Sequence, residues 1–499
     1  MMPRETRILR CALCISLCVS ACAPAAPAPP ATVTSVPPTP TAALAPTARP
    51  NYDATPLPTR EPFAAEQSLP YVTQTGDTVT AIAAHFNTTP EEVVAANPAL
   101  PLTGMLPPGM TLMVPAYWFS LGGTAFKIIP DSRFVYGPAD KDFDIDEYVQ
   151  AQPGYLWETS AFVAERHRTS AQTVLYVARQ YSISPRLLLA LMEWRTGALT
   201  QRDVPPEIKN DPFGPIEKVS GLYAQLRYVA EQLSIGYYGW RTGELTSLLL
   251  RDSTRSRVDM YQNAGTVGVQ YLFAQLFSFD EFQAAAGPQG FAATYLALWG
   301  NPFEADPVPE GLIPGNLSQP ELALPFTENQ TWAFTGGPHP GWGANLPWSA
   351  LDFAPPAGAT GCINTDKWVT AAAPGVVVRS DDNTLVLDLD GDGYEQTGWV
   401  LFHFHMSSSE LATVGTAVQT GGALGHPSCE GGTATGTHVH IARKYNGEWI
   451  PADGVIPFVL GGWTAQNGDA PYQGRMMRVG AWVEACTCST ASNTVYWAR

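Results

Sequence analysis

The hydrophobic and polar positions of residues 68–116 follow two periods, which predict two strands and two helices. Residues 71–73 and 111–114 are short apolar runs typical of strands. Between these runs, Thr78 is suited to cap one helix and Thr89 to cap a second. The first helix has the apolar spacing Val79, Ile82, Ala83 and Phe86. We therefore expect the order strand, helix, helix, strand.

Residues 145–300 show the spacing of amphipathic helices, with apolar side chains recurring at i, i+3 and i+4. Turn residues separate five such stretches, which are 160–181, 184–195, 217–236, 242–251 and 264–278. We expect an all-α middle domain over this range. A proline-rich linker is expected to follow it over residues 301–325.

From residue 326 onward, short runs rich in β-branched and aromatic residues alternate with Gly and Asp turns. These runs are 376–379, 384–389, 399–405 and 437–443. They predict a mostly antiparallel β domain over residues 326–465, with residues 466–499 as a C-terminal extension. The expected fold class is multidomain, with a small βααβ module, an all-α middle domain and a C-terminal β domain.

The first 22 residues are typical of a bacterial export signal. Three arginines precede an apolar run at residues 11–19, and small residues then lead to Cys22. This stretch resembles a lipoprotein lipobox, which implies that Cys22 carries a lipid; ordinary secretion with an incidental cysteine is the alternative. Residues 23–67 are rich in Pro, Ala and Thr and predict a linker. We expect an extracytoplasmic protein that is lipid-anchored to the bacterial membrane or cell surface.

Residues 68–116 resemble a LysM module. The resemblance rests on YVTQTGDTVTAIAAHF, on Asn97-Pro98 and on LPPGMTLMVP, which together cover nearly the whole segment. It implies binding to a glycan that contains N-acetylglucosamine, such as peptidoglycan; a small structural spacer is the alternative. His85 is expected to be a partly exposed helix residue.

Length and charge bear on the number of domains and on the kind of binding partner. A chain of 499 residues is too long for one hydrophobic core. Its 45 acidic and 28 basic residues give a formal net charge of −17. Because a phosphate backbone attracts a basic surface, we expect no nucleic-acid partner.

Residues 183–197 resemble the start of a degenerate lytic-transglycosylase-like helical domain. That family places its catalytic Glu before a Ser-Gly pair, and Arg195 stands at the matching position here. Arginine cannot donate a proton as a general acid, and Glu193 lies on a different helix face. We therefore expect a helical spacer or glycan-binding domain.

Six of the eight histidines lie in the predicted β domain. Alternate residues of a strand point to the same face, so His438 and His440 are expected side by side. The same argument pairs His403 with His405, and the two strands are expected to face a common groove. Histidine combined with aspartate is the composition of a catalytic zinc site.

Together with His339 and Asp352, these motifs resemble the M23 peptidases, the lysostaphin and β-lytic metallopeptidase group. The resemblance spans about residues 330–455 and implies one zinc ion per peptidase domain. Its zinc ligands would be His339, Asp352 and His440, and its catalytic histidines would be His405 and His438. His339 and Asp352 are thirteen positions apart, and this spacing resembles that of the β-lytic branch. It makes residues 340–349 an expected wall of the substrate groove.

Other residues around this site leave alternatives open. His403 either supports the site from behind or belongs to the core, and His426 is expected in a loop beside the site. Residues 388–393 mimic the start of a calcium loop, but the twelfth position is Trp399, so we expect a hairpin turn.

Four cysteines remain beyond the signal and Cys22, and they allow three pairings. Cys362–Cys429 is the preferred bridge because both residues flank the same predicted site. Cys486 and Cys488 either pair with each other or bind metal.

The sequence thus predicts a zinc-dependent endopeptidase that hydrolyses peptide crosslinks of bacterial peptidoglycan. A LysM module would hold it on the glycan, and the family branch suggests glycine-containing crosslinks. A non-catalytic wall-binding regulator that activates other cell-wall hydrolases is the alternative. A purely adhesive lipoprotein is a third reading, but it does not explain two facing histidine strands.

Overall fold

The computed structural model describes residues 67–117, 123–304, 306–357 and 359–497, which belong to one compact unit of the chain. The predicted signal at 1–22, with Cys22, and the linker up to residue 66 lie outside the described residues. Within the described part of the chain, no helix has the length and apolarity needed to cross a membrane.

The N-terminal module has the predicted order of elements. They are β1 (Gln67–Val72), α1 (Val79–His85), α2 (Pro90–Ala96) and β2 (Thr111–Ala116). β1 and β2 pair antiparallel, with Tyr71 opposite Leu112. Thr78 caps α1 by accepting the Ala81 N–H, and Thr89 forms a capping box with Glu92 at the start of α2.

His85 corrects one expectation for this module, because its side chain is buried. Its ring stacks on Trp240 with centroids 3.5 Å apart, and its Nε2 donates to the Trp240 carbonyl at 3.0 Å. Burial lowers the pKa of His85 to about 3. The module is therefore docked on α8 (Leu222–Thr242), which carries Trp240.

The middle domain is largely helical. Its helices are α3 (Asp131–Phe134), α4 (Ile145–Gln150), α5 (Ser170–Tyr181), α6 (Pro185–Thr196), α7 (Pro206–Asn210), α8, α9 (Ala264–Leu276), α10 (Phe279–Ala286) and α11 (Phe291–Trp299). The helices α5, α6, α8 and α9 share one buried apolar core.

Two hairpins correct the all-α expectation. β3 (Ser160–Val163) pairs with β4 (Arg166–Thr169) where a helix was predicted, and β5 (Ser247–Leu249) pairs with β6 (Arg255–Arg257). Ala164 and Glu165 have positive φ, so a tight turn forms between β3 and β4. The segment 301–325 forms no helix or strand in its described residues, yet it buries Leu312 and Leu324.

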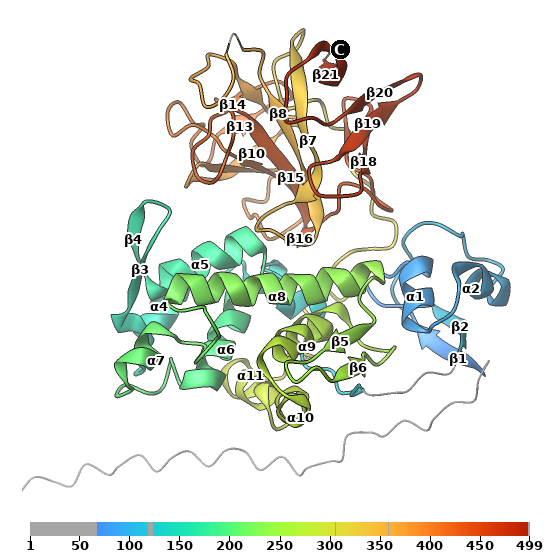
Figure 1. Ribbon diagram of the computed structural model, residues 1–499, viewed down its shortest axis with the longest axis vertical. Helices are drawn as coiled ribbons and strands as arrows, with labels where there is room; N and C mark the ends of the chain where they lie inside the picture. The colour runs from blue at the N-terminus through green and yellow to red at the C-terminus, as the bar shows by residue number, and fades with distance from the viewer. Residues whose placement is uncertain (1–66, 118–122, 305, 358, 498–499) are drawn as a thin grey trace, which may run out of the picture. The chain divides into compact units, whose positions relative to one another are not determined.

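An antiparallel sheet dominates the C-terminal domain (Figure 1), with the order β13-β10-β11-β12-β15-β8-β7-β21 and with β16 beside β15. Its strands are β7 (Thr331–Pro340), β8 (Trp348–Ala354), β10 (Gly375–Asp381), β11 (Thr384–Asp388), β12 (Trp399–Phe404), β13 (Ala417–Val418), β15 (Val439–Tyr445), β16 (Glu448–Trp449) and β21 (Thr494–Tyr496). Smaller sheets contain β9 (Val369–Thr370), β14 (Ala423–Gly425), β17 (Val459–Leu460), β18 (Trp463–Asn467), β19 (Gly474–Arg478) and β20 (Ala481–Glu484).

The predicted C-terminal extension belongs to this domain. β21 pairs with β7, and Trp497 is buried in the same core as the sheet. A boundary at residue 465 therefore cuts through the fold, since an edge strand of the main sheet follows it.

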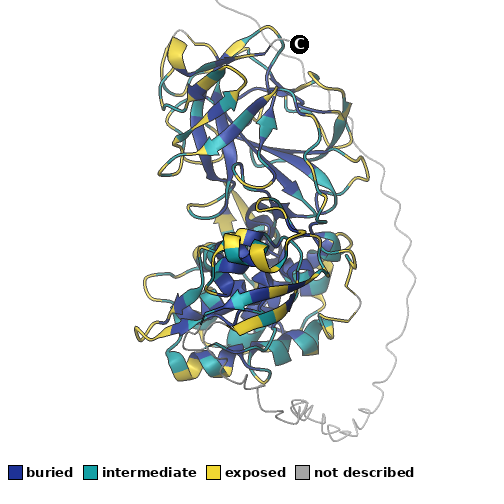
Figure 2. Cartoon of the chain, turned by 90° about the vertical axis from the view of Figure 1, so that its right-hand side faces the viewer, coloured by how far each residue is buried: buried dark blue, intermediate teal, exposed yellow. Residues whose placement is uncertain are grey.

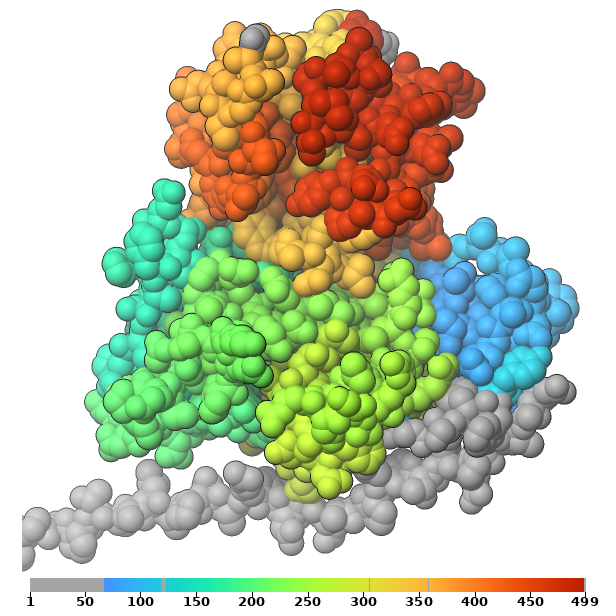
Figure 3. Space-filling model, viewed as in Figure 1, coloured from blue at the N-terminus to red at the C-terminus, as the bar shows by residue number. Residues whose placement is uncertain are grey.

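Both faces of the central strands β8, β11, β12 and β15 are buried, and Figure 2 draws buried strands in dark blue. One face packs within the C-terminal domain through Leu351, Leu401 and Ile441. The other face contributes Phe402 and Ala442 to the core that contains the middle-domain helices. Figure 3 shows the yellow-orange part of the sheet domain lying directly against the green helices.

Candidate functional site

Three neighbouring strands carry the predicted metal ligands. His339 lies on β7, Asp352 on β8 and His440 on β15, and the sheet places β8 between the other two strands. His440 is directly opposite Asp352 in the antiparallel register. Irregularities in β7 on both sides of His339 turn its side chain toward that pair.

The ligand atoms of these residues converge. His339 Nε2 lies 3.0 Å from His440 Nδ1 and 3.3 Å from Asp352 Oδ1. His440 Nδ1 lies 3.4 Å from the same carboxylate oxygen. Asp352 Oδ1 is buried and has no hydrogen-bond partner. An orphaned carboxylate oxygen facing two imidazole nitrogens fits a bound cation.

Backbone carbonyls fix the tautomers of both imidazoles. A carbonyl oxygen only accepts, so His339 Nδ1 donates to the Gly337 carbonyl at 2.7 Å and His440 Nε2 donates to the Gly341 carbonyl at 3.1 Å. The opposite nitrogens, His339 Nε2 and His440 Nδ1, therefore keep their lone pairs. Both lone pairs point to the centre of the cluster, as zinc ligation requires.

Charge and burial act in opposite directions on Asp352. Burial alone would raise the pKa of this carboxyl, but His339 and His438 hold its pKa well below the ordinary value. Burial lowers the pKa of His440. Asp352 is therefore held as a carboxylate and His440 as a neutral imidazole, which are the forms that bind a metal ion.

His405 and His438 form a second pair beside this cluster. Their rings lie 4.6 Å apart, and His438 Nε2 is 3.8 Å from Asp352 Oδ1. Each Nδ1 donates to a backbone carbonyl at 2.8 Å, that of Glu430 for His405 and that of Gly436 for His438. Each Nε2 is thus left to accept a proton. Burial, and next the charge of His438, lower the pKa of His405 to about 3.

The expectation that His403 and His405 share a face is wrong. β12 ends at Phe404, and His405 has φ +58°, a left-handed conformation that reorients its side chain toward His438. His403 instead points into the opposite face, where its Nδ1 donates to the Leu385 carbonyl at 3.3 Å. His426 bonds the Glu410 carboxylate at 2.9 Å and donates its Nδ1–H to the Lys367 carbonyl at 2.8 Å.

Disulfides hold the loops at this end of the sheet. Cys362 and Cys429 are joined, and Thr437 next to His438 receives the Ile363 N–H at 2.8 Å on its hydroxyl. The bridge therefore secures the segments that flank both catalytic candidates. Cys486 and Cys488 pair with each other.

The expected groove wall is the connection between β7 and β8. Trp342 lies edge-on to Phe404 at 4.6 Å and to Tyr176 of α5 at 6.4 Å. This wall is therefore packed between the sheet and a helix of the middle domain.

Tyr472 was not identified from the sequence. Its ring stacks on His339 at 4.1 Å, it is 49% exposed, and its φ is +69°. A half-exposed aromatic side chain on a metal-ligand candidate is suited to contact substrate. No motif surrounds this residue, so only the structure brings it to the site.

Two carboxylates that the sequence raised as candidates, for acid catalysis and for calcium binding, accept hydrogen bonds from neighbouring residues. The Glu193 carboxylate accepts the Leu199 N–H at 2.7 Å and the Thr200 hydroxyl at 2.6 Å. Asp388 accepts the N–H groups of Asp390, Gly391 and Gly393 and so closes the turn between β11 and β12.

Comparison with known proteins gives two domain matches and several relatives. Residues 71–115 match the LysM domain, and residues 127–310 match the LasA N-terminal domain. Protease LasA of Pseudomonas aeruginosa is 24% identical over 342 residues, which cover 65% of this chain and 75% of that protein. A beta-lytic metalloendopeptidase of Achromobacter lyticus is 29% identical over 163 residues, or 31% of this chain and 39% of that protein.

Among solved structures, the M23 metalloprotease pseudoalterin from the deep sea is 26% identical and covers 34% of this chain and 96% of that chain, with a TM-score of 0.28. The sequence matches to LasA and to the beta-lytic metalloendopeptidase bear out the expected resemblance to this metallopeptidase group. More narrowly, this chain is a relative of LasA and the beta-lytic metalloendopeptidases, and it carries a LysM domain and a LasA N-terminal domain.

Proposed function

We propose that this protein is a zinc-dependent endopeptidase that hydrolyses peptide crosslinks of bacterial peptidoglycan. The convergence of His339, Asp352 and His440 around an orphaned carboxylate oxygen is the observation that supports it most strongly. The LysM domain would hold the enzyme on wall glycan and so raise the local substrate concentration. Glycine-containing crosslinks are the substrate that the family branch favours.

Bound zinc would leave a fourth position for water and lower the pKa of that water toward ~7. In this scheme, one free Nε2 of His405 or His438 accepts a proton during attack on the peptide carbonyl. The resulting imidazolium stabilises the negative charge that develops on the carbonyl oxygen. The same pair then returns a proton to the leaving amine, so no covalent enzyme intermediate is needed.

Metal content and cleavage test this proposal together. The purified full chain is expected to contain one zinc per molecule by mass spectrometry of the metal, and to cleave crosslinked wall peptides. A chelator should remove both properties, and added zinc should restore them. A folded, metal-free chain that cleaves nothing would overturn the proposal.

Two substitutions separate metal binding from proton transfer. His440→Ala should lose the zinc, because it removes one of three ligands. His438→Ala should keep the zinc but lose roughly 10²–10⁴-fold in cleavage rate, the usual effect of removing a general acid–base group. His426→Ala is the matched control, since the His426 ring bonds Glu410 and Lys367 and no member of the cluster.

A non-catalytic wall-binding regulator remains the alternative function. It predicts that H438A would still activate a second wall hydrolase as well as the unaltered chain does. The proton-accepting histidine pair favours the enzyme, because a regulator has no use for two free imidazole nitrogens beside three convergent ligands.

We also propose that the protein is extracytoplasmic and anchored by a lipid on Cys22. Cys22→Ser should abolish labelling with a fatty-acid analogue and release the chain from the membrane fraction. A labelled C22S variant, or an unlabelled natural chain, would contradict the anchor.

A further inference from the structure

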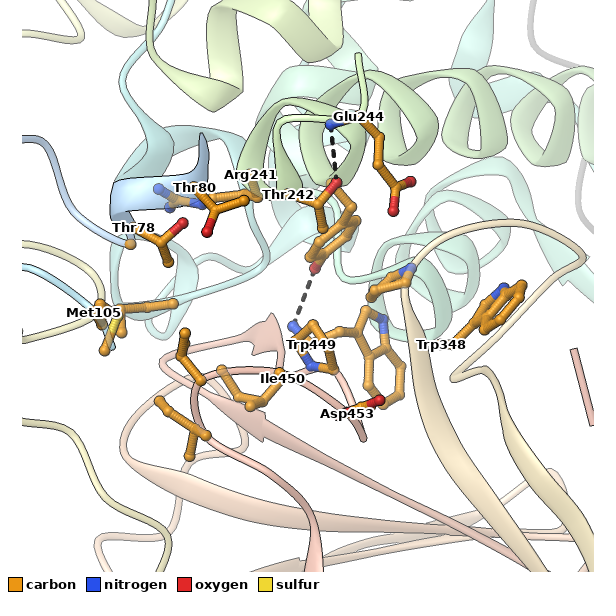
Figure 4. Close-up of a pocket in the computed structure, with 18 of the residues that line it drawn as sticks. Thr78, Thr80, Met105, Arg241, Thr242, Glu244, Trp348, Trp449, Ile450 and Asp453 are labelled. Carbon is orange, nitrogen blue, oxygen red and sulfur yellow. Dashed lines mark hydrogen bonds between the residues drawn. The ribbon is translucent and has the colours of Figure 1, made fainter. Parts of the chain in front are cut away.

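A cavity of about 420 Å³ opens where the LysM domain, the end of α8 and the C-terminal domain meet. In Figure 4, Thr78, Thr80 and Met105 of the LysM domain lie on one side, and Trp449 and Ile450 lie across from them. The volume is within the range of about 300–1,000 Å³ that is typical of small-molecule sites. Three segments far apart in the sequence thus form one site.

Buried contacts fix the shape of this cavity. Arg241 pairs with Asp131 and with Glu448 of β16, each at 3.0 Å, and it also donates to the Thr75 carbonyl of the LysM domain. Tyr238 accepts the Trp449 N–H on its hydroxyl at 3.0 Å. One arginine therefore connects all three walls, and the cavity is formed in advance of any ligand.

The lining suits a neutral, amphipathic ligand. Trp348, Met105, Leu102 and Val455 provide apolar surface, while threonine hydroxyls and the carboxylates of Glu244 and Asp453 provide hydrogen-bonding groups. Arg241 and Glu448 neutralise each other, and the remaining carboxylates repel an anion. Sugar rings have apolar C–H faces and polar edges, so they match this combination.

Two exposed apolar side chains belong to opposite walls of the cavity. Leu102 of the LysM domain and Val455 of the C-terminal domain each expose 47% of their surface. Exposed apolar side chains on both walls of a preformed cavity are typical of ligand-binding surfaces.

We propose that this cavity is a composite glycan site, which holds an oligosaccharide of N-acetylhexosamines between LysM and peptidase-domain walls. The inference rests on the proposed wall-directed function and assigns part of its substrate recognition to the C-terminal domain. The indole of Trp449 also lies against Gly341, whose carbonyl receives the Nε2–H of His440. Trp449 and Gly341 therefore connect the cavity to the candidate metal ligand His440.

Binding of an N-acetylglucosamine tetramer to the full chain, measured by calorimetry, tests the composite site. Leu102→Arg and Val455→Arg should each weaken binding by roughly tenfold or more, because each places a charged side chain on one wall. Val479→Arg is the matched control, since Val479 is fully exposed in the turn between β19 and β20. All three variants should keep the unfolding midpoint of the unaltered chain.

The outcomes separate the cavity from the peptidase proposal. Loss of binding in both V455R and L102R, with V479R unchanged, supports the composite site even if no peptide is cleaved. Loss in L102R alone would overturn it, because the LysM domain would then bind by itself. No binding by the unaltered chain would overturn it as well. Cleavage of a glycan-free peptide should be equal in V479R and the unaltered chain.

Discussion

The two faces of the main β-sheet are buried by different means. The face that packs within the C-terminal domain is mainly apolar, with Leu351, Leu401 and Ile441, although it also buries His403 and Arg443. The face toward the middle domain mixes aromatic residues with charged groups, including Lys444 and the carboxylate of Glu448. His440 and Asp352 lie on this second face.

This difference has a physical consequence for the site. Lys444 and Glu448 on the second face have partners on α5 and α8, because Lys444 donates to the Arg179 carbonyl and Glu448 pairs with Arg241. The middle domain is therefore a structural cover for the same face that carries the candidate metal ligands. Variants of the two faces should respond differently, and the expected effects below descend in size.

The largest effect is expected at the buried arginine of the second face. Arg241→Ala should lower the free energy of unfolding by about 3–5 kcal/mol, because it leaves Asp131 and Glu448 buried without their cation. Urea denaturation measures the change. Arg255→Ala is the control at an exposed position, and a loss below about 1 kcal/mol in R241A would contradict the buried pairing.

A smaller loss is expected on the apolar face. Leu401→Ala removes a fully buried side chain and should cost about 3 kcal/mol, through lost burial and a residual cavity. Leu401→Met, which conserves volume, should cost less than about 1.5 kcal/mol. Equal losses in the two variants would show that this face does not depend on close packing.

Lys444 should make the second face sensitive to pH. Burial lowers its pKa to about 7 from 10.5, with Glu395 and Arg379 as the charged neighbours. Between these two values the unfolded chain holds the proton and the folded chain does not, so stability is lost as pH falls from 10.5 to 7. Raising the pH from 7 to 9.5 should therefore stabilise the protein, by something on the order of 3 kcal/mol.

Lys444→Met keeps the apolar stem but carries no proton, so its stability should rise less over this pH range. Urea midpoints at pH 7 and 9.5 measure the difference. Lys141→Met, at an exposed position, should keep the slope of the unaltered chain. The same slope in K444M would exclude Lys444 as its source.

The smallest effect is expected at His403. Its Nε2 is buried on the apolar face without a partner, so His403→Leu removes an unsatisfied group. Zinc content and cleavage should be unchanged, and stability should change by no more than about 1 kcal/mol. Loss of zinc in H403L would show that His403 supports the metal site.

Several elements could be derived from the sequence because their signals are local. Thr78 and Thr89 predict the starts of the helices that they cap. The strands β10, β11, β12 and β15 coincide with the runs of β-branched and aromatic residues. The convergence of His339, Asp352 and His440 was expected from a family pattern and is present in the structure. His85 and Tyr472 gave no such signal, because their neighbours come from distant segments.

The sequence by itself determined the elements, the likeness to metallopeptidases and the set of candidate ligands, since periodicity and short motifs depend on neighbouring residues alone. Tertiary structure decided which sheet face each residue occupies. Period-2 alternation groups the residues of a strand but does not say which group faces which partner. The left-handed backbone of His405, the cover of α5 and α8, and the cavity beside Trp449 all depend on long-range packing, and only the folded chain shows them.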